Sequence, residues 1–348
     1  MLGNPLTDSV FPSPIDSIKS QDSTLISVIG VGDIMMGSHF PSSNYLPPNN
    51  DCAPLLDPVK HILNDADVTF GNLEGCFLDE GKVVKQCKDT TKCYAFKMPS
   101  KYVSCLTEGG FDVVSLANNH VGDFGDAGRV NTINLLDSVG IHFGGLLSHP
   151  TVIFERNGTK FGFCAFSPNV GTCDINDSIS VKRIVSELKK LCDIVIVSFH
   201  GGAEGADNVH VTRSSEVFYG ENRGNVYEFS RQVIDAGADI VFGHGPHVTR
   251  AIDLYKDRFI AYSLGNFCTY SRFNLKGPNG FAPIVKLYID KSGKFVKGKI
   301  FAVKQIGSGG PVLDSDNQVT KEIQRLTRMD FPESLLKIDF DGSINVKE

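Results

Sequence analysis

The sequence lacks a long apolar run, an excess of positive charge and any CxxC pair. No segment approaches the roughly 18 consecutive apolar residues of a membrane-spanning helix, so we expect no transmembrane segment in this chain. The net charge of −6 offers no basic surface for nucleic acid or for an anionic membrane. Without a CxxC pair, a zinc ribbon is excluded.

The beginning of the chain also lacks the apolar stretch of a signal peptide. Residues 1–23 are rich in Pro, Ser and Asp, which predicts a flexible lead-in or the end of an anchor linker. The nine cysteines are an odd number, so at least one thiol is unpaired within the chain. Cys87 and Cys93 bracket a polar loop and are predicted to form a disulfide. Four other cysteines lie in apolar runs and are predicted to be small core residues: Cys105, Cys164, Cys192 and Cys268.

What the sequence does contain is an alternation of strand and helix patterns over 348 residues. Apolar runs predict strands at 25–31, 67–73, 112–116, 141–143, 193–199 and 240–242. Apolar spacing predicts helices at 54–65, 100–108, 127–138, 179–190, 225–236 and 319–329. Hairpins are predicted around Asn157-Gly158 and Lys256-Asp257. We therefore expect α/β layers in a single domain, 24–348, with a core at about 25–270 and further strands and a helix in 282–330.

Five of the predicted strands end in, or are followed by, residues that suit metal binding. They are Asp33, Asn72 and Glu74, Asn119 and His120, His200, and finally His244 and His247. In open α/β sheets, ligands bind outside the carboxyl ends of the strands. A single Asp at such a place is usually a cap, and a single His is usually structural. Five strand ends that all carry such residues together predict a metal-binding site.

The donor types indicate the kind of ion. Carboxylate, amide oxygen and imidazole together suit Mn, Fe or Zn, and suit Mg less readily. Six of these residues, Asp33, Glu74, Asn119, His200, His244 and His247, are candidate ligands, which exceeds the needs of one tetrahedral zinc, so we expect two divalent metals that share a bridging carboxylate.

Six blocks of sequence resemble a known family. They are Gly32–Gly37, Asn72–Glu74, Ala117–His120, His200–Glu204, Asp235–His247 and Ser263–Phe267. In this order they are similar to the poly-gamma-glutamate capsule-synthesis (CapA) family, a branch of the calcineurin-like metallophosphoesterases, over roughly residues 25–270. The resemblance implies a four-layer α/β/β/α sandwich with a dinuclear site at one edge of the sheets. Together with the cysteine count, it also implies an extracytoplasmic place in the bacterial cell envelope.

The resemblance also implies roles for individual residues. Asp33 and His247 would bind the first metal, with Glu74 as the bridge, and Asn119, His200 and His244 would bind the second. His120 would be the general acid, and Glu204 would orient a ligand or substrate. Asn72 and Asn266 are expected to bind substrate. Arg213 and Arg223 are candidates to receive a substrate carboxylate or phosphate, with plain surface arginines as the equal alternative.

The sequence departs from the metallophosphoesterase superfamily pattern at two places. The superfamily's Asp-x-His is Asp33-Ile34-Met35 here, and its Gly-His-x-His is stretched to Gly-His-Gly-Pro-His at 243–247. We therefore expect the first metal to be weakly held, absent, or completed by water or by His39.

Three functional hypotheses follow. The first is a metal-dependent hydrolase of a phosphoester or a similar bond, which serves an extracellular polymer. The second is a non-catalytic, metal-stabilised component of a capsule synthesis or export complex, in contact with membrane proteins of that complex. The third is a gamma-glutamyl peptidase or transferase that acts on the anionic polymer itself.

Overall fold

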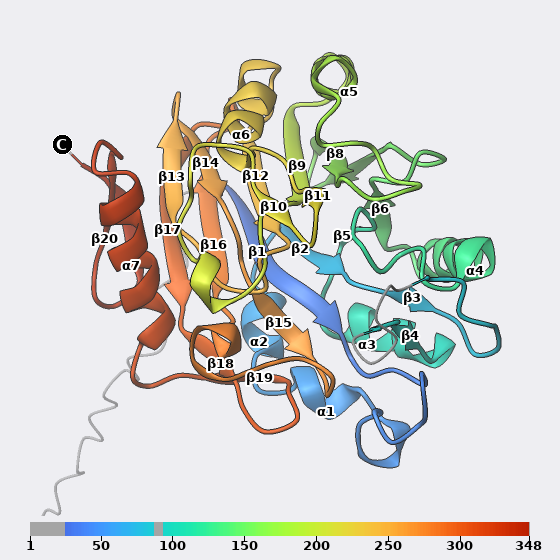
Figure 1. Ribbon diagram of the computed structural model, residues 1–348. Coiled ribbons are helices and arrows are strands. Elements are labelled where there is room, and N and C mark those ends of the chain that lie inside the picture. The colour runs from blue at the N-terminus through green and yellow to red at the C-terminus, as the bar shows by residue number, and fades with distance from the viewer. Residues whose placement is uncertain (1–24, 87–92, 348) are drawn as a thin grey trace, which may run out of the picture.

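The computed structural model describes residues 25–86 and 93–347 (Figure 1). The lead-in expected over residues 1–23 therefore lies outside the described residues, and so does Cys87 of the expected Cys87–Cys93 disulfide. Within the described ranges, no helix combines the length and the apolar character that crossing a bilayer requires.

The larger sheet has nine strands and is built around β1 (Ile26–Met35). On one side, β1 pairs in parallel with β2 (Val68–Leu73), followed by β5 (Val113–Ser115) and β6 (His142–Gly144). On the other side it pairs antiparallel with β16 (Ile284–Ile289), followed by β17 (Phe295–Phe301), β21 (Ser343–Val346) and β20 (Leu336–Ile338). The carboxyl half of β1 also pairs in parallel with β15 (Asn266–Thr269).

The smaller sheet has six strands in the order β13-β14-β12-β9-β8-β7. Their bounds are Ile252–Tyr255, Arg258–Ala261, Ile240–His244, Ile194–His200, Thr159–Phe166 and Thr151–Arg156. The three central strands β12, β9 and β8 run parallel, and both hairpins predicted from the sequence, β7–β8 and β13–β14, are present at the edges.

The alternation of side chains along the strands produces the layers. In β9, Ile194 and Ile196 face the larger sheet, whereas Val195 and Val197 face the helices on the other side. Between the sheets, the rings of Phe70 and Phe242 stack with their centroids 5.3 Å apart. Each such fully buried side chain contributes roughly 1.5–3 kcal/mol to folding. The two sheets thus share one apolar core, with a second core on the outer face of each.

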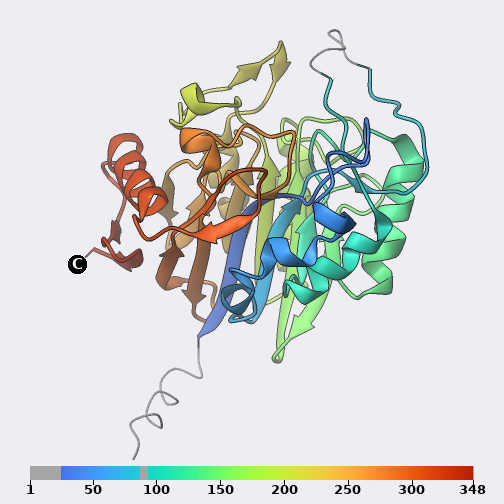
Figure 2. The same ribbon diagram turned by 90° about the horizontal axis from the view of Figure 1, so that it is seen from below.

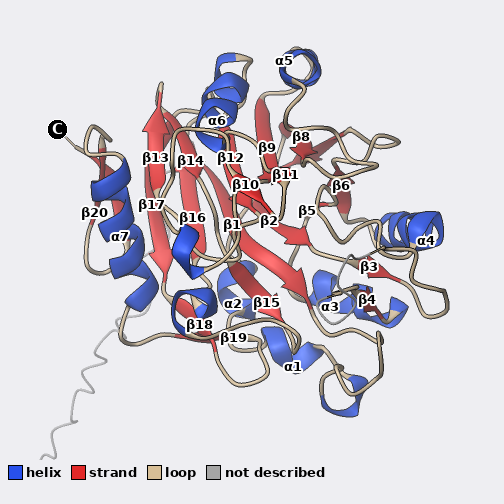
Figure 3. Ribbon diagram, in the orientation of Figure 1, coloured by secondary structure: helices blue, strands red, loops and turns tan. Residues whose placement is uncertain are grey.

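Helices cover both outer faces (Figures 1 and 3). The larger sheet carries α1 (Ala53–Leu56), α2 (Lys60–Leu63), α3 (Val103–Glu108) and α4 (Gly125–Ser138). The smaller sheet carries α5 (Ser178–Lys189) and α6 (Val226–Asp235), and α7 (Gln318–Asp330) packs beside β13. The four-layer α/β/β/α sandwich expected from the sequence is confirmed.

Short strands complete the structure. They are β3 (Cys76–Phe77), β4 (Lys97–Met98), β10 (Val217–Phe218), β11 (Glu221–Asn222), β18 (Val303–Gln305) and β19 (Pro311–Leu313). The β10–β11 hairpin stands out from the end of the sheets opposite to the start of β1 (Figure 2).

Two local predictions were wrong. The helix expected over 54–65 is divided into α1 and α2, because Pro58 has no N–H to donate and its ring obstructs a continuous helix. Cys105 was expected to be a core thiol, but it forms a disulfide with Cys52. The two cysteines are 53 residues apart in sequence, and they meet only because α1 and α3 pack side by side on the larger sheet. Cys164, Cys192 and Cys268 are buried free thiols, as predicted.

Candidate metal centre

The registers of the strands bring the predicted site residues together. Within the larger sheet, Asp33 of β1 lies beside Asn72 of β2. Within the smaller sheet, His200 of β9 lies beside His244 of β12. The two sheets meet at these ends, because Nδ1 of His244 lies 3.2 Å from Oδ1 of Asp33. One buried cluster therefore contains residues from both sheets.

Asp33 is the carboxylate at the centre of this cluster. It is fully buried, its Oδ1 accepts a hydrogen bond of 2.8 Å from Asn72, and its Oδ2 lies 3.0 Å from Nδ1 of His247. Burial alone would raise the pKa of Asp33, but the adjacent His244 and His247 imidazoles outweigh it and hold the pKa well below its usual range. Asp33 is therefore ionised and orients the imidazoles around it.

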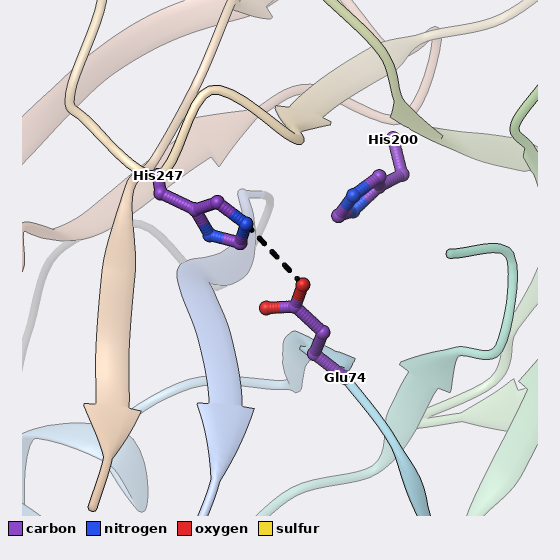
Figure 4. Close-up of side chains that lie close together, drawn as sticks. All are labelled: Glu74, His200 and His247. Carbon is purple, nitrogen blue, oxygen red and sulfur yellow. Dashed lines mark ion pairs between the residues drawn. The ribbon is translucent and has the colours of Figure 1, made fainter. Parts of the chain in front are cut away.

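Three side chains in this cluster are placed to hold a cation. The ligand atoms of Glu74, His200 and His247 lie within 4.8 Å of one another. Figure 4 shows Nε2 of His247 pointing at Oε1 of Glu74, 3.4 Å away, with the His200 ring on the other side of the carboxylate. Two imidazoles and a carboxylate are a donor set that suits Zn, Mn or Fe.

Buried polar atoms without partners support this assignment. Among the described residues, several buried atoms of the cluster make no hydrogen bond: both carboxylate oxygens of Glu74, Nε2 of His200, both ring nitrogens of His244 and Oδ1 of Asn119. Leaving such atoms unpaired costs about 1–3 kcal/mol each. A divalent cation would satisfy them, so the residues present fit a metal.

The pKa shifts indicate the protonation of the candidate ligands before a cation binds. Burial raises the pKa of Glu74 well above its ordinary value and lowers the pKa of His200 well below its own. Burial would also lower the pKa of His247, but the Glu74 and Asp33 carboxylates outweigh it and raise the pKa to about 10. His200 is thus neutral and ready to bind, whereas His247 holds a proton that a metal must displace.

The turn after β12 fixes His247. Gly245 has φ +113, and a Cβ there would lie 2.6 Å from the carbonyl oxygen of Gly201, so only glycine fits. His247 itself has φ +56, a left-handed conformation that is rare for a residue with a side chain. Asn266 holds it in place: its Nδ2 donates to the His247 carbonyl at 3.2 Å, and its Oδ1 lies 3.1 Å from Nδ1.

His120 lies beside the cluster with a partner of its own. Its Nε2 is 3.9 Å from Oε1 of Glu74, and its Nδ1 is 2.7 Å from Oδ2 of Asp123. Lys85 lies 3.0 Å from the other oxygen of Asp123. Burial lowers the pKa of His120, while Asp123 opposes this effect. Asp123 accepts a hydrogen bond from Nδ1–H and leaves Nε2 facing Glu74.

Four site residues predicted from the sequence lie in different places: Asn72, Glu204, Arg223 and Arg213. Asn72 donates to Asp33 and contacts Nδ1 of His200 at 3.4 Å, so Asn72, like Asn266, supports residues of the cluster. Arg223 is buried, with Nη2 3.2 Å from Oε1 of Glu204. Arg213 is not brought to the cluster: it is exposed, pairs with Glu333 and lies against the rings of Tyr227 and Phe331.

Sequence reasoning missed three residues that the structure places here: Asn118, Asp123 and Lys85. Asn118 donates to Oδ1 of Asn72 at 3.3 Å and to the Leu73 carbonyl at 2.8 Å, and so ties the loop after β5 to β2. The spacing of three residues between His120 and Asp123 was a usable signal for a carboxylate behind an imidazole. Nothing local in the sequence marks Lys85.

Comparisons with known proteins agree on one family. The family model described as "Bacterial capsule synthesis protein PGA_cap" matches residues 27–271. The capsule biosynthesis protein CapA of Bacillus anthracis is 28% identical over 280 residues, which are 75% of this chain and 62% of that protein. The PGA biosynthesis protein CapA of Bacillus subtilis is 29% identical over 267 residues, 72% of this chain and 65% of that protein. The chain thus spans a little under two thirds of the length of these two relatives.

Among solved structures, a hypothetical protein from Thermus thermophilus superposes with a TM-score of 0.50 at 16% identity, covering 81% of this chain and 100% of that one. This likeness concerns the fold alone.

Proposed function

Since the chain belongs to the bacterial capsule synthesis protein family, we propose that it is a metal-dependent hydrolase that serves the synthesis of a capsule or similar extracellular polymer at the cell envelope. The observation that supports a catalytic role is the group Glu74, His200 and His247, whose ligand atoms converge, while both oxygens of Glu74 and Nε2 of His200 lack a hydrogen-bond partner among the described residues. The names of the two CapA relatives support the polymer context.

In this proposal the described side chains divide the work of holding one or two divalent ions. Glu74, His200 and His247 are the primary ligands, and His244 and Asn119 supply the further unpaired donors. Asp33 holds His247 by its Nδ1–H, or binds the first ion directly when one is present. A divalent ion at such a centre polarises an ester oxygen and lowers the pKa of water toward about 7.

The proton for the leaving group comes from His120. Its Nδ1–H is fixed by Asp123, so its Nε2 is the atom that faces the centre and can donate to a leaving oxygen. The 3.9 Å between Nε2 and Glu74 leaves the two groups in contact range without a hydrogen bond. Because its pKa is lowered by burial, His120 gives up its proton readily.

The test combines metal analysis with a substrate screen. We expect protein purified without chelator to contain Mn, Fe or Zn, and to hydrolyse a generic phosphodiester such as bis-p-nitrophenyl phosphate. His200→Ala and Asn119→Ala should lose both metal and activity, while His210→Ala, a change outside the cluster, should keep both. Metal-free wild type, or full activity in His200→Ala, would refute the hydrolase.

A second candidate is a non-catalytic, metal-stabilised component of a synthesis or export complex. The observation in its favour is Met35, which stands where the metallophosphoesterase superfamily pattern has a histidine and packs with no exposure in the apolar core beneath the helices. A protein with one bound metal and no activity on phosphodiesters or on gamma-linked glutamate oligomers would favour this candidate. Activity on the oligomers alone would indicate a gamma-glutamyl peptidase or transferase.

A further inference from the structure

Arg223 lies in the loop that follows His200, and Arg250 lies beside this loop. Both arginines are buried, but they differ in the hydrogen bonding of their guanidinium groups. Arg250 is 1% exposed and all its nitrogens are used: Nε donates to the Asn208 carbonyl, and Nη1 and Nη2 pair with the two oxygens of Glu216 at 2.9 and 2.8 Å. Arg223 is 2% exposed, yet its Nε and Nη2 are buried and make no hydrogen bond to any described residue. Arg250 is a structural arginine, and Arg223 does not fit that description.

The backbone of Arg223 is held firmly although most of its guanidinium is not. Its N–H donates to the Glu216 carbonyl at 2.8 Å, and its own carbonyl accepts from the N–H of Gly202 at 2.9 Å. Gly202 lies two residues after the candidate ligand His200. The backbone of Arg223 is therefore held next to the segment that follows His200 by main-chain bonds that do not depend on what the guanidinium binds.

Oε2 of Glu221 lies 3.5 Å from Nη1 of Arg223, whereas the carboxylate beside the unpaired Nη2 is that of Glu204. Its Oε1 is 3.2 Å from Nη2, within ion-pair distance but outside hydrogen-bond geometry. The N–H of Gly205, the residue after Glu204, donates to the carbonyl of Pro246 at 2.9 Å, so Glu204 lies beside the turn that carries His247. Unlike Arg223, the Glu204 side chain is 24% exposed, so it can leave this position for solvent.

We propose that Arg223 receives an oxyanion of the substrate, and that the Glu204 carboxylate occupies the place of that oxyanion when no substrate is bound. The ligand class is a phosphate or a carboxylate, since either accepts the paired N–H groups of a guanidinium. This inference rests on the proposed function, because it assumes that substrate reaches the same centre. It assigns different roles to the two arginines that the sequence could not separate.

The proposal explains an otherwise costly arrangement. A buried guanidinium with unused donors is unfavourable in the free protein. An incoming oxyanion would supply the missing acceptors, and Glu204 would move to water, where its charge is well solvated. The binding energy thus depends on two residues in opposite directions: Arg223 favours the anion, and Glu204 competes with it.

The experiment measures binding of two probes, inorganic phosphate and glutarate, to metal-loaded protein by calorimetry. We expect Arg223→Gln to weaken the affinity for the tighter-binding probe by about tenfold or more, because a charge-assisted pair is lost. Arg223→Lys should recover only part of the affinity, since an ammonium keeps the charge but not the fork. Glu204→Gln should strengthen binding, because it removes the competing charge.

Arg213→Gln is the matched control, since this arginine of the same loop pairs with Glu333 away from the centre. Its affinity should stay within about twofold of the wild type, as expected of a surface position. Tighter binding of phosphate identifies a phosphoester substrate, and tighter binding of glutarate identifies a carboxylate substrate.

The inference is overturned if loaded wild type binds neither probe, if Arg223→Lys and Arg223→Gln bind as tightly as wild type, or if Glu204→Gln weakens binding. Each of these results leaves metal uptake intact and so leaves the proposed function standing. Failure of wild type to take up metal would instead refute the proposed function. If Arg223→Gln does not fold, the direction of the Glu204→Gln effect still decides the question.

Discussion

The carboxylate of Asp33 lies 3.0 Å from Nδ1 of His247, although 214 residues separate them in the sequence. Asp33 belongs to β1 of the larger sheet, and His247 follows β12 of the smaller sheet. The contact therefore joins the two halves of the sandwich at the centre. A cation bound by Glu74 and His247 would add a second connection at the same point, so metal binding and the stability of the whole fold are linked.

Metal removal should therefore destabilise the protein. At a free metal concentration of about 100 times Kd, a ligand that binds only the folded state adds about 2.7 kcal/mol to the free energy of unfolding. We expect chelation to lower Tm by several degrees and re-addition of Mn²⁺ or Zn²⁺ to restore it, as measured by calorimetry. His247→Ala should abolish the response to chelator, whereas His210→Ala should retain it. An equal response in both variants would place the metal elsewhere.

The metal-free protein should lose stability as the pH rises from about 7 toward 10. His247 has a folded pKa of about 10 against an ordinary value of 6.5, so its contribution is complete below 6.5 and is lost as the pH rises through 10. Glu74, with its raised pKa, acts in the same direction. The slope for one group is at most about 1.4 kcal/mol per pH unit. Chemical denaturation of chelated protein at pH 7, 8.5 and 10 measures it.

His247→Gln removes one of the two titrating groups and should flatten this dependence. His210→Gln changes a partly exposed histidine that pairs with Asp330, and should leave the slope as it is. A metal-free protein that is equally stable at pH 7 and pH 10 would contradict the charge assignment at the centre.

The sequence predicted the strands that carry the metal centre better than it predicted the residues that surround this centre. Apolar runs such as 193–199 and 240–242 mark strands that are buried on both faces, and the residues that follow them lie at one end of the sheets for geometric reasons. Arg213 and Arg223 could not be separated, because the sequence does not show which way a loop folds. Asp123 was missed although its spacing of three residues from His120 was a usable signal in the sequence.

Long-range pairings also escaped prediction. Cys52 and Cys105 lie in segments whose helical patterns say nothing about which helix packs against which. The interruption of the predicted helix at Pro58, in contrast, could have been foreseen from the residue itself.

The disulfide between Cys52 and Cys105 should be a large contributor to stability. It closes a loop between residues 53 positions apart, for which chain entropy predicts roughly 4 kcal/mol as an upper value. We expect the double variant Cys52→Ala/Cys105→Ala to lose about 2–4 kcal/mol in denaturant unfolding. Cys268→Ala, which removes one buried free thiol, is the control for loss of packing. If the double variant were as stable as Cys268→Ala, the cross-link would contribute nothing beyond its volume.

The two neighbours of His120 should shift the pH dependence of hydrolysis in opposite directions. A general acid must be protonated, so the rate should fall as the pH rises through the pKa of His120, which burial holds below 6.5. Asp123 raises this pKa and Lys85 lowers it. Asp123→Asn should therefore move the falling limb of kcat/KM to lower pH, and Lys85→Met should move it to higher pH, both with metal content unchanged. Removal of structural support alone would lower the rate in both variants without moving the falling limbs of their kcat/KM profiles apart. If the falling limbs of both variants coincide with that of the wild type, His120 is not the proton donor.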